Sequence, residues 1–182
     1  MAPHRAAPKS AFRENLESIL WAAALALAIR TFIVAPFKIP SGSMRPTLME
    51  GDRILVSKFL YHVREPRRGD IIVFRFPENP RRPFIKRLIG VGGDRVEIRD
   101  GHVMVNDHPQ SPSMRRETYY YNQGPFGQEH AVTQVPEDAY FVLGDNSASS
   151  HDSRFWGFVP KRLLIGKALC IFWPPHRIRI LR

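Results

Sequence analysis

The chain has 182 residues, enough for one domain with a sizeable core, and its 43% hydrophobic and 24% charged residues exclude both a disordered chain and a wholly membrane-embedded protein. The formal net charge of +10 is compatible with binding to nucleic acid, with an anionic membrane surface or with a soluble basic protein. The single cysteine, Cys170, excludes an intramolecular disulfide and a zinc site built from several cysteines.

The N-terminal segment combines basic residues with an apolar run over residues 19–35 that only Arg30 and a threonine interrupt. One interpretation is a transmembrane anchor over residues 16–35, preceded by a short cytoplasmic tail over residues 1–15. A helix over the run would span roughly 25 Å at ~1.5 Å per residue, slightly short of a bilayer core. The alternative is a cleaved secretory signal, for which Ala26-Leu27-Ala28 provides an A-x-A site. A third interpretation is a buried helix of a soluble protein. Either of the first two places the rest of the chain outside the cytoplasm.

Residues 36–182 alternate short apolar runs with Gly, Pro and Asp turn signals, a pattern that predicts one mostly β domain. The clearest element is a hairpin over residues 95–106, whose strands meet at Asp100-Gly101, the signature of a tight type I′ turn. Residues 107–136 are polar and irregular, contain a run of three tyrosines, and predict a surface excursion to which we assign no role. The other expected strands cover residues 53–59, 71–76, 84–91, 140–143 and 163–173.

The loop over residues 39–48 places two serines, Ser41 and Ser43, on either side of Gly42. Prolines before and after the serines restrict the backbone, and the glycine removes a Cβ that would obstruct a close approach. This composition suits a loop that holds two hydroxyls in fixed positions. Ordinary turns are made from the same residue types, so the loop alone leaves both interpretations open.

The sequence lacks the motifs of several common kinds of functional site. The sequence has no P-loop and no dinucleotide-binding glycine pattern, and we expect no cofactor. The seven histidines are scattered without a His-Glu-x-x-His pattern, so we expect no metal site. His151 and Asp152 are neighbours that would point to opposite faces of a strand, which disfavours a serine–histidine–aspartate triad.

Lysine is the other base that can activate a serine, and Lys86 is the best placed of the lysines. On a strand it shares a face with Phe84 and Leu88, while Arg87 points the other way. A lysine base needs its pKa lowered from ~10.4 to about 7–8, which corresponds to roughly 4 kcal/mol and requires an apolar pocket. The competing interpretation is a solvated basic face shared with Arg81-Arg82 and Arg87, and the run of charges alone favours it.

Five sequence boxes then occur in a fixed order, at residues 30–48, 51–56, 68–74, 84–96 and 144–160. Together they resemble signal peptidase I, the bacterial leader peptidase family, over nearly the whole chain. The resemblance implies a mostly β fold of folded antiparallel sheets forming a coiled barrel, preceded by one N-terminal transmembrane helix. In its light the segment 16–35 is expected to be an anchor and not a cleaved signal.

The resemblance also implies a serine–lysine dyad. Ser43 aligns with the nucleophile that forms an acyl-enzyme, and Lys86 aligns with the general base that takes its proton and later activates the deacylating water. The hydroxyl of Ser41, with the backbone N–H of Ser43, aligns with the oxyanion hole.

Further positions align with supporting roles. Ser150 matches a serine that orients the base, and Asp152 and Arg154 match an ion pair near the site. Shallow pockets for small substrate residues at −1 and −3, which explain an A-x-A preference, are implied at Phe37, Ile39 and Ile85.

The chain departs from the family pattern at Ser147-Ala148-Ser149, where the family commonly has Arg-Asp-Asn, so a charged pair is lost.

The function implied is a membrane-bound serine endopeptidase that cleaves signal peptides from exported preproteins. The resemblance implies a single-pass protein of the bacterial inner membrane, with the catalytic domain 36–182 on the periplasmic or extracellular side, where the positive charge would contact anionic lipid headgroups. A specialised peptidase of the same dyad class, of the conjugation or organellar type, stays open as an alternative. A basic nucleic-acid-binding module is supported by charge alone, and no nucleic acid partner is expected.

Overall fold

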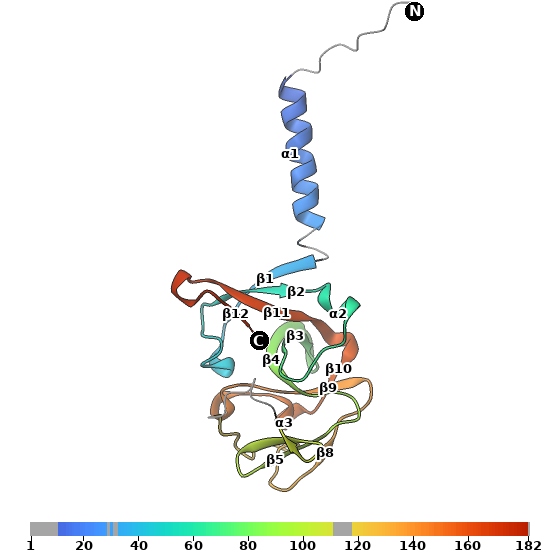
Figure 1. Cartoon of the computed structure of the whole chain (residues 1–182), viewed down its shortest axis with the longest axis vertical. Coiled ribbons are helices and arrows are strands. Elements are labelled where there is room, and N and C mark those ends of the chain that lie inside the picture. Colours follow the sequence, from blue (N-terminus) through green and yellow to red (C-terminus); the bar gives the residue numbers. More distant parts are fainter. Residues whose placement is uncertain (1–10, 29, 31–32, 111–117, 182) are drawn as a thin grey trace, which may run out of the picture.

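The structure is a computed structural model that describes residues 11–28, 30, 33–110 and 118–181. A single long helix, α1 (Ala11–Ala28), stands away from a body made mostly of β-strands (Figure 1). Two short helices, α2 (Leu60–Val63) and α3 (Ser153–Trp156), lie within that body. The expectation of a mostly β chain is confirmed.

The strands form two antiparallel sheets. The larger sheet has eight strands in the order β1-β2-β11-β3-β4-β9-β10, with β12 paired to β11, and the smaller sheet has four in the order β7-β6-β5-β8. The larger sheet consists of β1 (Val34–Lys38), β2 (Arg53–Ser57), β3 (Ile71–Phe76), β4 (Asn79–Gly90), β9 (Ala139–Leu143), β10 (Val159–Pro160), β11 (Leu164–Trp173) and β12 (Arg179–Ile180). The smaller sheet consists of β5 (Arg95–Arg99), β6 (His102–Val105), β7 (His108–Pro109) and β8 (Thr133–Gln134).

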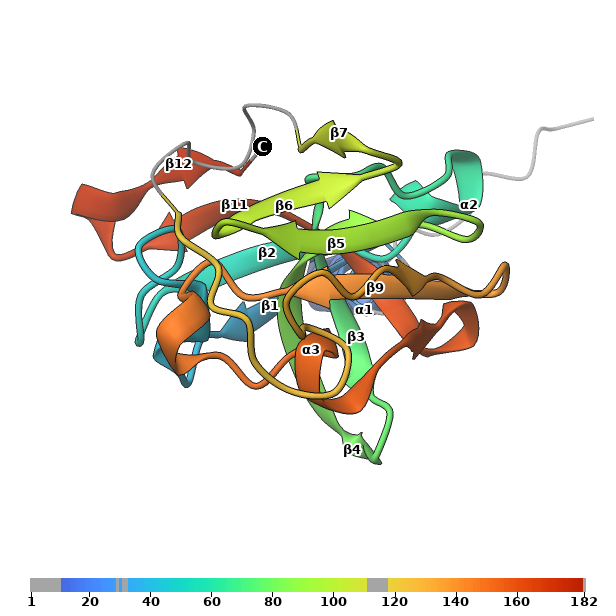
Figure 2. The same ribbon diagram turned by 90° about the horizontal axis from the view of Figure 1, so that it is seen from below.

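The smaller sheet lies at the end of the body remote from α1, and Figure 2 shows β5, β6 and β7 next to one another there. One buried apolar cluster joins the two sheets, because Ile89, Phe141 and Leu143 of the larger sheet pack with Val96 and Ile98 of the smaller one. Burying these side chains removes apolar surface from water and fixes the two sheets relative to each other.

The strand predictions agree with the structure where the apolar pattern is continuous. The five residues of β9 are all buried, as are five of the six residues of β3, which is typical of strands covered on both faces. The predicted hairpin is confirmed, since Arg99 pairs with His102 and both Asp100 and Gly101 have positive φ.

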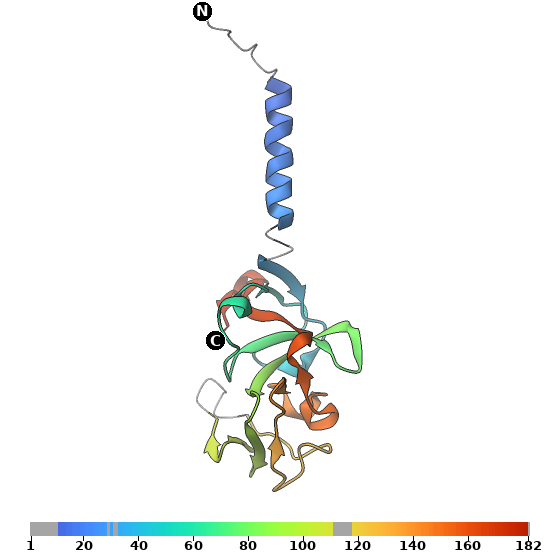
Figure 3. The same cartoon turned by 90° about the vertical axis from the view of Figure 1, so that its right-hand side faces the viewer.

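Two strand predictions need correction. The strand expected over residues 84–91 is part of the longer β4, which starts at Asn79 and forms with β3 a hairpin that projects from the body (Figure 3). The predicted excursion 107–136 contributes the short strands β7 and β8 to the smaller sheet, and its residues 111–117 lie outside the described part.

The predicted transmembrane helix over residues 16–35 differs from what the structure contains. The helix is α1, which ends at Ala28, and Val34 and Ala35 instead pair with β2 as the first residues of β1. Among the described residues no helix is both long enough and apolar enough to cross a membrane. Residues 29 and 31–32 of the expected anchor, and residues 1–10 of the expected tail 1–15, lie outside the described part.

Candidate active site

The loop over residues 39–48, called the serine loop below, is held at both ends by the larger sheet and its core. After β1, the N–H of Ile39 donates to the carbonyl of Asp52 at 2.9 Å, so the loop begins as a continuation of the sheet. The short 3-10 turn Gly42–Met44 follows, and the side chains of Met44 and Leu48 are completely buried in the core beneath it. Buried anchors on both sides of Ser43 give its hydroxyl a fixed position.

Lys86 reaches this hydroxyl from the neighbouring part of the sheet. It lies on β4 opposite Ile72 of β3, and its Nζ donates a hydrogen bond to Ser43 Oγ at 2.6 Å. Only 4% of Lys86 and 8% of Ser43 are exposed, and the ammonium lies 5.5 Å from the ring centroid of Phe84. The sequence left open a solvated basic face for Lys86, and the structure contradicts that alternative.

Burial lowers the pKa of Lys86 from its ordinary value of 10.5 to about 8, although the carboxylates of Asp152 and Asp145 act in the opposite direction. Taking an ammonium out of water disfavours its charged form, which is why burial is the dominant cause. A neutral amine has a lone pair with which it can accept the proton of the Ser43 hydroxyl. The pair is therefore chemically able to act as a nucleophile and its base.

Arg87, next to the lysine, is buried as well and forms an ion pair with Asp145 that sequence reasoning missed. Its guanidinium donates to both carboxylate oxygens of Asp145 at 2.7 and 2.6 Å, and to the carbonyl of Gly69 at 2.8 Å. This bidentate contact ties β4 to the loop after β9. The only signal in the sequence was the Gly-Asp-Asn motif that follows a short apolar strand.

Asn146 is a second residue that the sequence did not single out. Its N–H donates to the carbonyl of Ser43 at 3.0 Å, and its side-chain amide donates to the carbonyl of Gly42 at 3.1 Å. The loop after β9 thus holds the backbone of the serine loop directly.

Ser41 is exposed at the start of the 3-10 turn, with an extended backbone, and its hydroxyl does not cap the turn. A small pocket lies beside this loop, with a volume of about 80 Å³. It is lined by the predicted Phe37, Ile39 and Ile85, together with Lys38, Pro40, Ile54, Val73, Pro83 and Phe84. Its small size favours a small side chain.

A buried serine–lysine pair next to a small apolar pocket is consistent with a peptidase site, and comparisons with known proteins decide the family. The family described as "Signal peptidase, peptidase S26" matches residues 12–173. The chain belongs to this family. The resemblance drawn from the five boxes is thereby confirmed.

Two relatives of known family agree with this assignment, and one solved structure is also similar in sequence. Signal peptidase I of Leptolyngbya laminosa is 42% identical over 185 residues, covering 97% of this chain and 88% of the relative. Signal peptidase I of Pseudomonas aeruginosa is 34% identical over 200 residues, covering 85% of this chain and 70% of the relative. A crystal structure of a signal peptidase I from Enterococcus faecalis is 35% identical and covers 57% of this chain and 97% of that one, with a TM-score of 0.48.

In this member of the signal peptidase family, Asp152 and Arg154 form a completely buried ion pair beside the site. Arg154 Nε donates to Asp152 Oδ1 at 2.8 Å, and its Nη2 donates to Oδ2 at 3.0 Å. Asp152 also accepts from the N–H of Gly144 at 3.0 Å and precedes α3 as its N-cap. The pair therefore links the loop that follows β9 to α3.

The altered segment Ser147-Ala148-Ser149 is part of the same network. Arg154 Nη1 donates to Ser147 Oγ at 2.7 Å and to the carbonyl of Tyr121 at 2.9 Å, and the N–H of Tyr121 donates to Ser147 Oγ at 2.9 Å. In this chain a serine hydroxyl thus connects the buried arginine to the excursion that follows β7.

Ser150 has no hydrogen-bond partner for its buried hydroxyl among the described residues, so its predicted orienting role lacks a contact in this structure. A Cβ added at Gly144 would lie 2.1 Å from Ser150 Oγ and 2.5 Å from the carbonyl oxygen of Ser43. Glycine is required at this position because the two segments pass so close.

His151 does not enter a catalytic relay with Asp152. Its exposed ring packs against Phe76 and Phe155, with ring centroids 6.1 and 5.3 Å apart. The carboxylate of Asp152 is occupied by Arg154 and Gly144, in agreement with the prediction that the chain has no conventional triad.

Proposed function

We propose that this chain is a membrane-associated serine endopeptidase that removes signal peptides from exported preproteins, with Ser43 as nucleophile and Lys86 as general base. The observation that carries the proposal is the hydrogen bond of 2.6 Å between Lys86 Nζ and Ser43 Oγ in a buried site. The family assignment supports the reaction, and the small pocket beside Ser41 supports the substrate preference.

The proposed reaction begins with neutral Lys86. The amine accepts the proton of the Ser43 hydroxyl while Oγ attacks the scissile carbonyl, and negative charge develops on the carbonyl oxygen. The Ser41 hydroxyl and the backbone N–H of Ser43 donate to that oxygen, where one donor of this kind is worth about 3 kcal/mol. The N–H belongs to the first residues of a short helical turn, which have no acceptor within the turn.

The Lys86 ammonium then gives its proton to the leaving amine, which departs as the new N-terminus of the mature protein. The signal peptide remains as an ester of Ser43. Neutral Lys86 next takes a proton from a water molecule that attacks this ester. The bond to Ser43 Oγ then breaks, Lys86 returns the proton to Oγ, and the signal peptide leaves with a free carboxyl group, so the same base serves both half-reactions. Asp152, Arg154 and the Arg87–Asp145 pair hold the segments that carry the reacting groups.

For the cellular location we propose the outer side of a bacterial inner membrane, with the N-terminal segment attached to the lipid and residues 36–182 as the catalytic domain. The support is the set of large apolar side chains that α1 exposes, with 60% or more exposure at Ile19, Leu20, Trp21, Leu25 and Leu27. Such an apolar surface, away from the core, is typical of lipid or protein contact.

The proposed function is tested by incubating the purified chain with a preprotein that carries an A-x-A site and identifying the products by mass. We expect one cut after the second alanine, and strongly reduced cleavage when tryptophan replaces that alanine, because the pocket of about 80 Å³ favours a small side chain. His151→Ala is expected to keep full activity, since the His151 ring packs against the rings of Phe76 and Phe155 and has no part in the proposed reaction. Cleavage that ignores the −1 residue would contradict the substrate assignment.

The pH dependence of cleavage follows from the lowered pKa of Lys86. With a pKa of about 8, roughly a tenth of the lysine is neutral at pH 7, compared with about 0.03% for an ordinary lysine. We expect kcat/KM to rise about tenfold per pH unit below pH 8 and to level off above it, because only the neutral amine can accept the proton. Steady-state kinetics between pH 6 and pH 9.5 measure this, with thermal unfolding recorded at each pH as the control for folding. A flat profile over that range would contradict the role of Lys86 as the base.

A further inference from the structure

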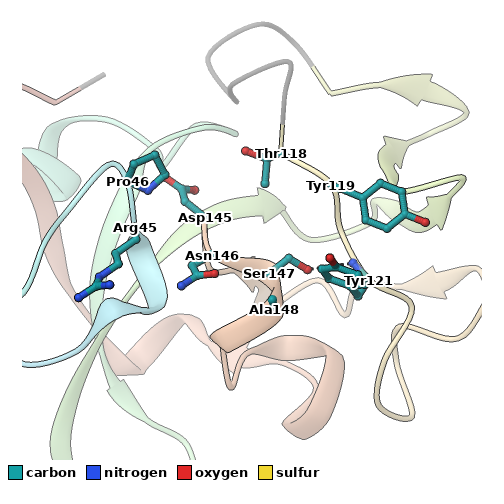
Figure 4. A pocket seen from close by; sticks show the side chains of 9 residues that line it. All are labelled: Arg45, Pro46, Thr118, Tyr119, Tyr121, Asp145, Asn146, Ser147 and Ala148. Carbon is teal, nitrogen blue, oxygen red and sulfur yellow. Dashed lines mark hydrogen bonds between the residues drawn. The ribbon is translucent and has the colours of Figure 1, made fainter.

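A second, larger pocket lies beside the serine loop and has a volume of about 440 Å³. Figure 4 shows Arg45 and Pro46 on one side of it, Tyr119 and Tyr121 on the other, and the segment 145–148 between them. Thr118 completes the lining. Neither the dyad nor the small apolar pocket uses these side chains.

Tyr119 and Tyr121 form one side of the pocket, and their backbone is fixed by the packing and hydrogen bonds of their neighbours. Tyr120 is buried in the core between the two sheets, so the alternation of the extended chain turns Tyr119 and Tyr121 outward, where they are 55% and 46% exposed. Both backbone groups of Tyr121 are hydrogen-bonded to the Arg154–Ser147 network, and the two exposed rings pack edge to face with centroids 5.1 Å apart. Exposed aromatic rings on a fixed backbone are typical of a binding surface.

The pocket adjoins the backbone of the serine loop. Asn146, in its floor, donates to the carbonyls of both Ser43 and Gly42. Within the segment that carries Ser43, residues 37–40 contribute to the lining of the small pocket, and Arg45 and Pro46 contribute to the lining of the larger one. Ser43 thus lies between these two parts of the chain, so a substrate whose residues before the scissile bond occupy the small pocket can continue, after the bond, into the larger one.

The charges of the pocket are compensated. Arg45 is paired with Glu50 at 2.6 Å, and Asp145 is paired with Arg87. The remaining lining offers phenol and alcohol hydroxyls, an amide and the two rings. Such a lining suits a peptide with uncharged side chains better than an acidic or basic one.

We propose that this pocket binds the first residues of the mature segment, on the leaving side of the scissile bond, and that Tyr119 and Tyr121 contact an uncharged, preferentially aromatic side chain there. The proposal rests on the proposed function and adds a second determinant of substrate choice to the A-x-A preference. It also gives the tyrosine run, to which the sequence assigned no role, a place in substrate recognition.

The test compares two substrates with the same signal-side sequence ending in A-x-A. One continues into a mature segment with phenylalanine near its start, and the other carries only an aminocoumarin amide after the scissile bond. We expect Tyr121→Ala and Tyr119→Ala to lower kcat/KM about three- to tenfold on the first substrate, the range of an aromatic contact, and to leave it within about twofold on the second. Tyr121→Phe keeps the ring and is expected to retain most of the activity.

Two further variants guard against a purely structural effect. Ala148→Trp fills the exposed floor of the pocket without removing a hydrogen bond, and we expect it to reduce cleavage of the first substrate alone. Phe59→Ala removes an exposed aromatic ring outside the pocket and is the matched control. We expect it to leave kcat/KM unchanged for both substrates. Thermal unfolding of each variant reports on its folding.

The outcomes separate the two proposals. Equal loss on both substrates, or no loss on either, would overturn the assignment of the pocket to the mature segment while leaving signal-peptide cleavage intact. If the unsubstituted protein cleaves neither substrate, the proposed function itself fails, and the pocket assignment fails with it. Selective loss with the long substrate supports both.

Discussion

Replacing Lys86 by methionine is expected to abolish cleavage, with a fall in kcat/KM of at least about 1,000-fold, while the fold is kept. Methionine has a similar unbranched shape but no lone pair of sufficient basicity, so the Ser43 hydroxyl loses its proton acceptor. Ser43→Ala is expected to be inactive to the same degree, and the double variant no worse than either single one, because the two groups act as a unit. The measurement is steady-state cleavage of an A-x-A preprotein at pH 8.

A measurement of stability distinguishes loss of the base in Lys86→Met from unfolding of the variant. Lowering the pKa of Lys86 from 10.5 to about 8 means that the folded protein binds the proton less tightly than the unfolded chain does, at a cost of about 3 kcal/mol at neutral pH. The unfolded state holds more protons between pH 8 and pH 10.5, so the stability of the unsubstituted protein rises with pH across that window. Lys86→Met removes this cost and is expected to raise the melting temperature at pH 7. A variant that stays active would eliminate Lys86 as the base.

The sequence was sufficient to single out Ser43 and Lys86 as a candidate pair, which the structure brings into contact, but not to decide the environment of the lysine. Alternation on a strand placed Lys86 with Phe84, and the structure agrees. The basic residues around Lys86 do not form one solvated face, because Lys86 and Arg87 are buried while the pair Arg81-Arg82 is exposed. The difference arises because β3 and β9 pair with the second half of β4 on both sides and bury it. The local sequence pattern does not predict such long-range strand pairing.

The parts that sequence reasoning missed depend on contacts between distant segments. Arg87 and Asp145 are 58 positions apart, and Asn146 contacts Gly42 across 104 positions. Each is an ordinary polar residue in a loop or strand until the fold brings the loop after β9 against the serine loop. Local patterns likewise could not show that Val34 and Ala35 continue into a strand, because apolar residues at a helix end and in a strand look alike over two positions.

The Asp152–Arg154 pair is expected to dominate the stability of the site. Asp152→Ala leaves the completely buried guanidinium of Arg154 without its carboxylate, and breaking a buried ion pair in this way costs about 3–5 kcal/mol. It also removes the acceptor for the Gly144 N–H and the N-cap of α3. For a domain of this size the loss corresponds to a fall in melting temperature of about 10 °C, measurable by calorimetry.

Two comparisons show whether the unpaired charge is the cause. Arg95→Ala breaks the exposed pair that Arg95 forms with Asp107 and is expected to change the free energy of unfolding by less than about 1 kcal/mol. Adding Arg154→Met to Asp152→Ala removes the uncompensated charge, so we expect part of the lost stability to return although two residues are now changed. If Asp152→Ala shifts the melting temperature no more than Arg95→Ala does, the pair does not hold the loop after β9 in place. A further fall in the double variant would instead assign the stability to the remaining hydrogen bonds of Arg154, with Ser147 and Tyr121, since these survive Asp152→Ala and are lost with Arg154→Met.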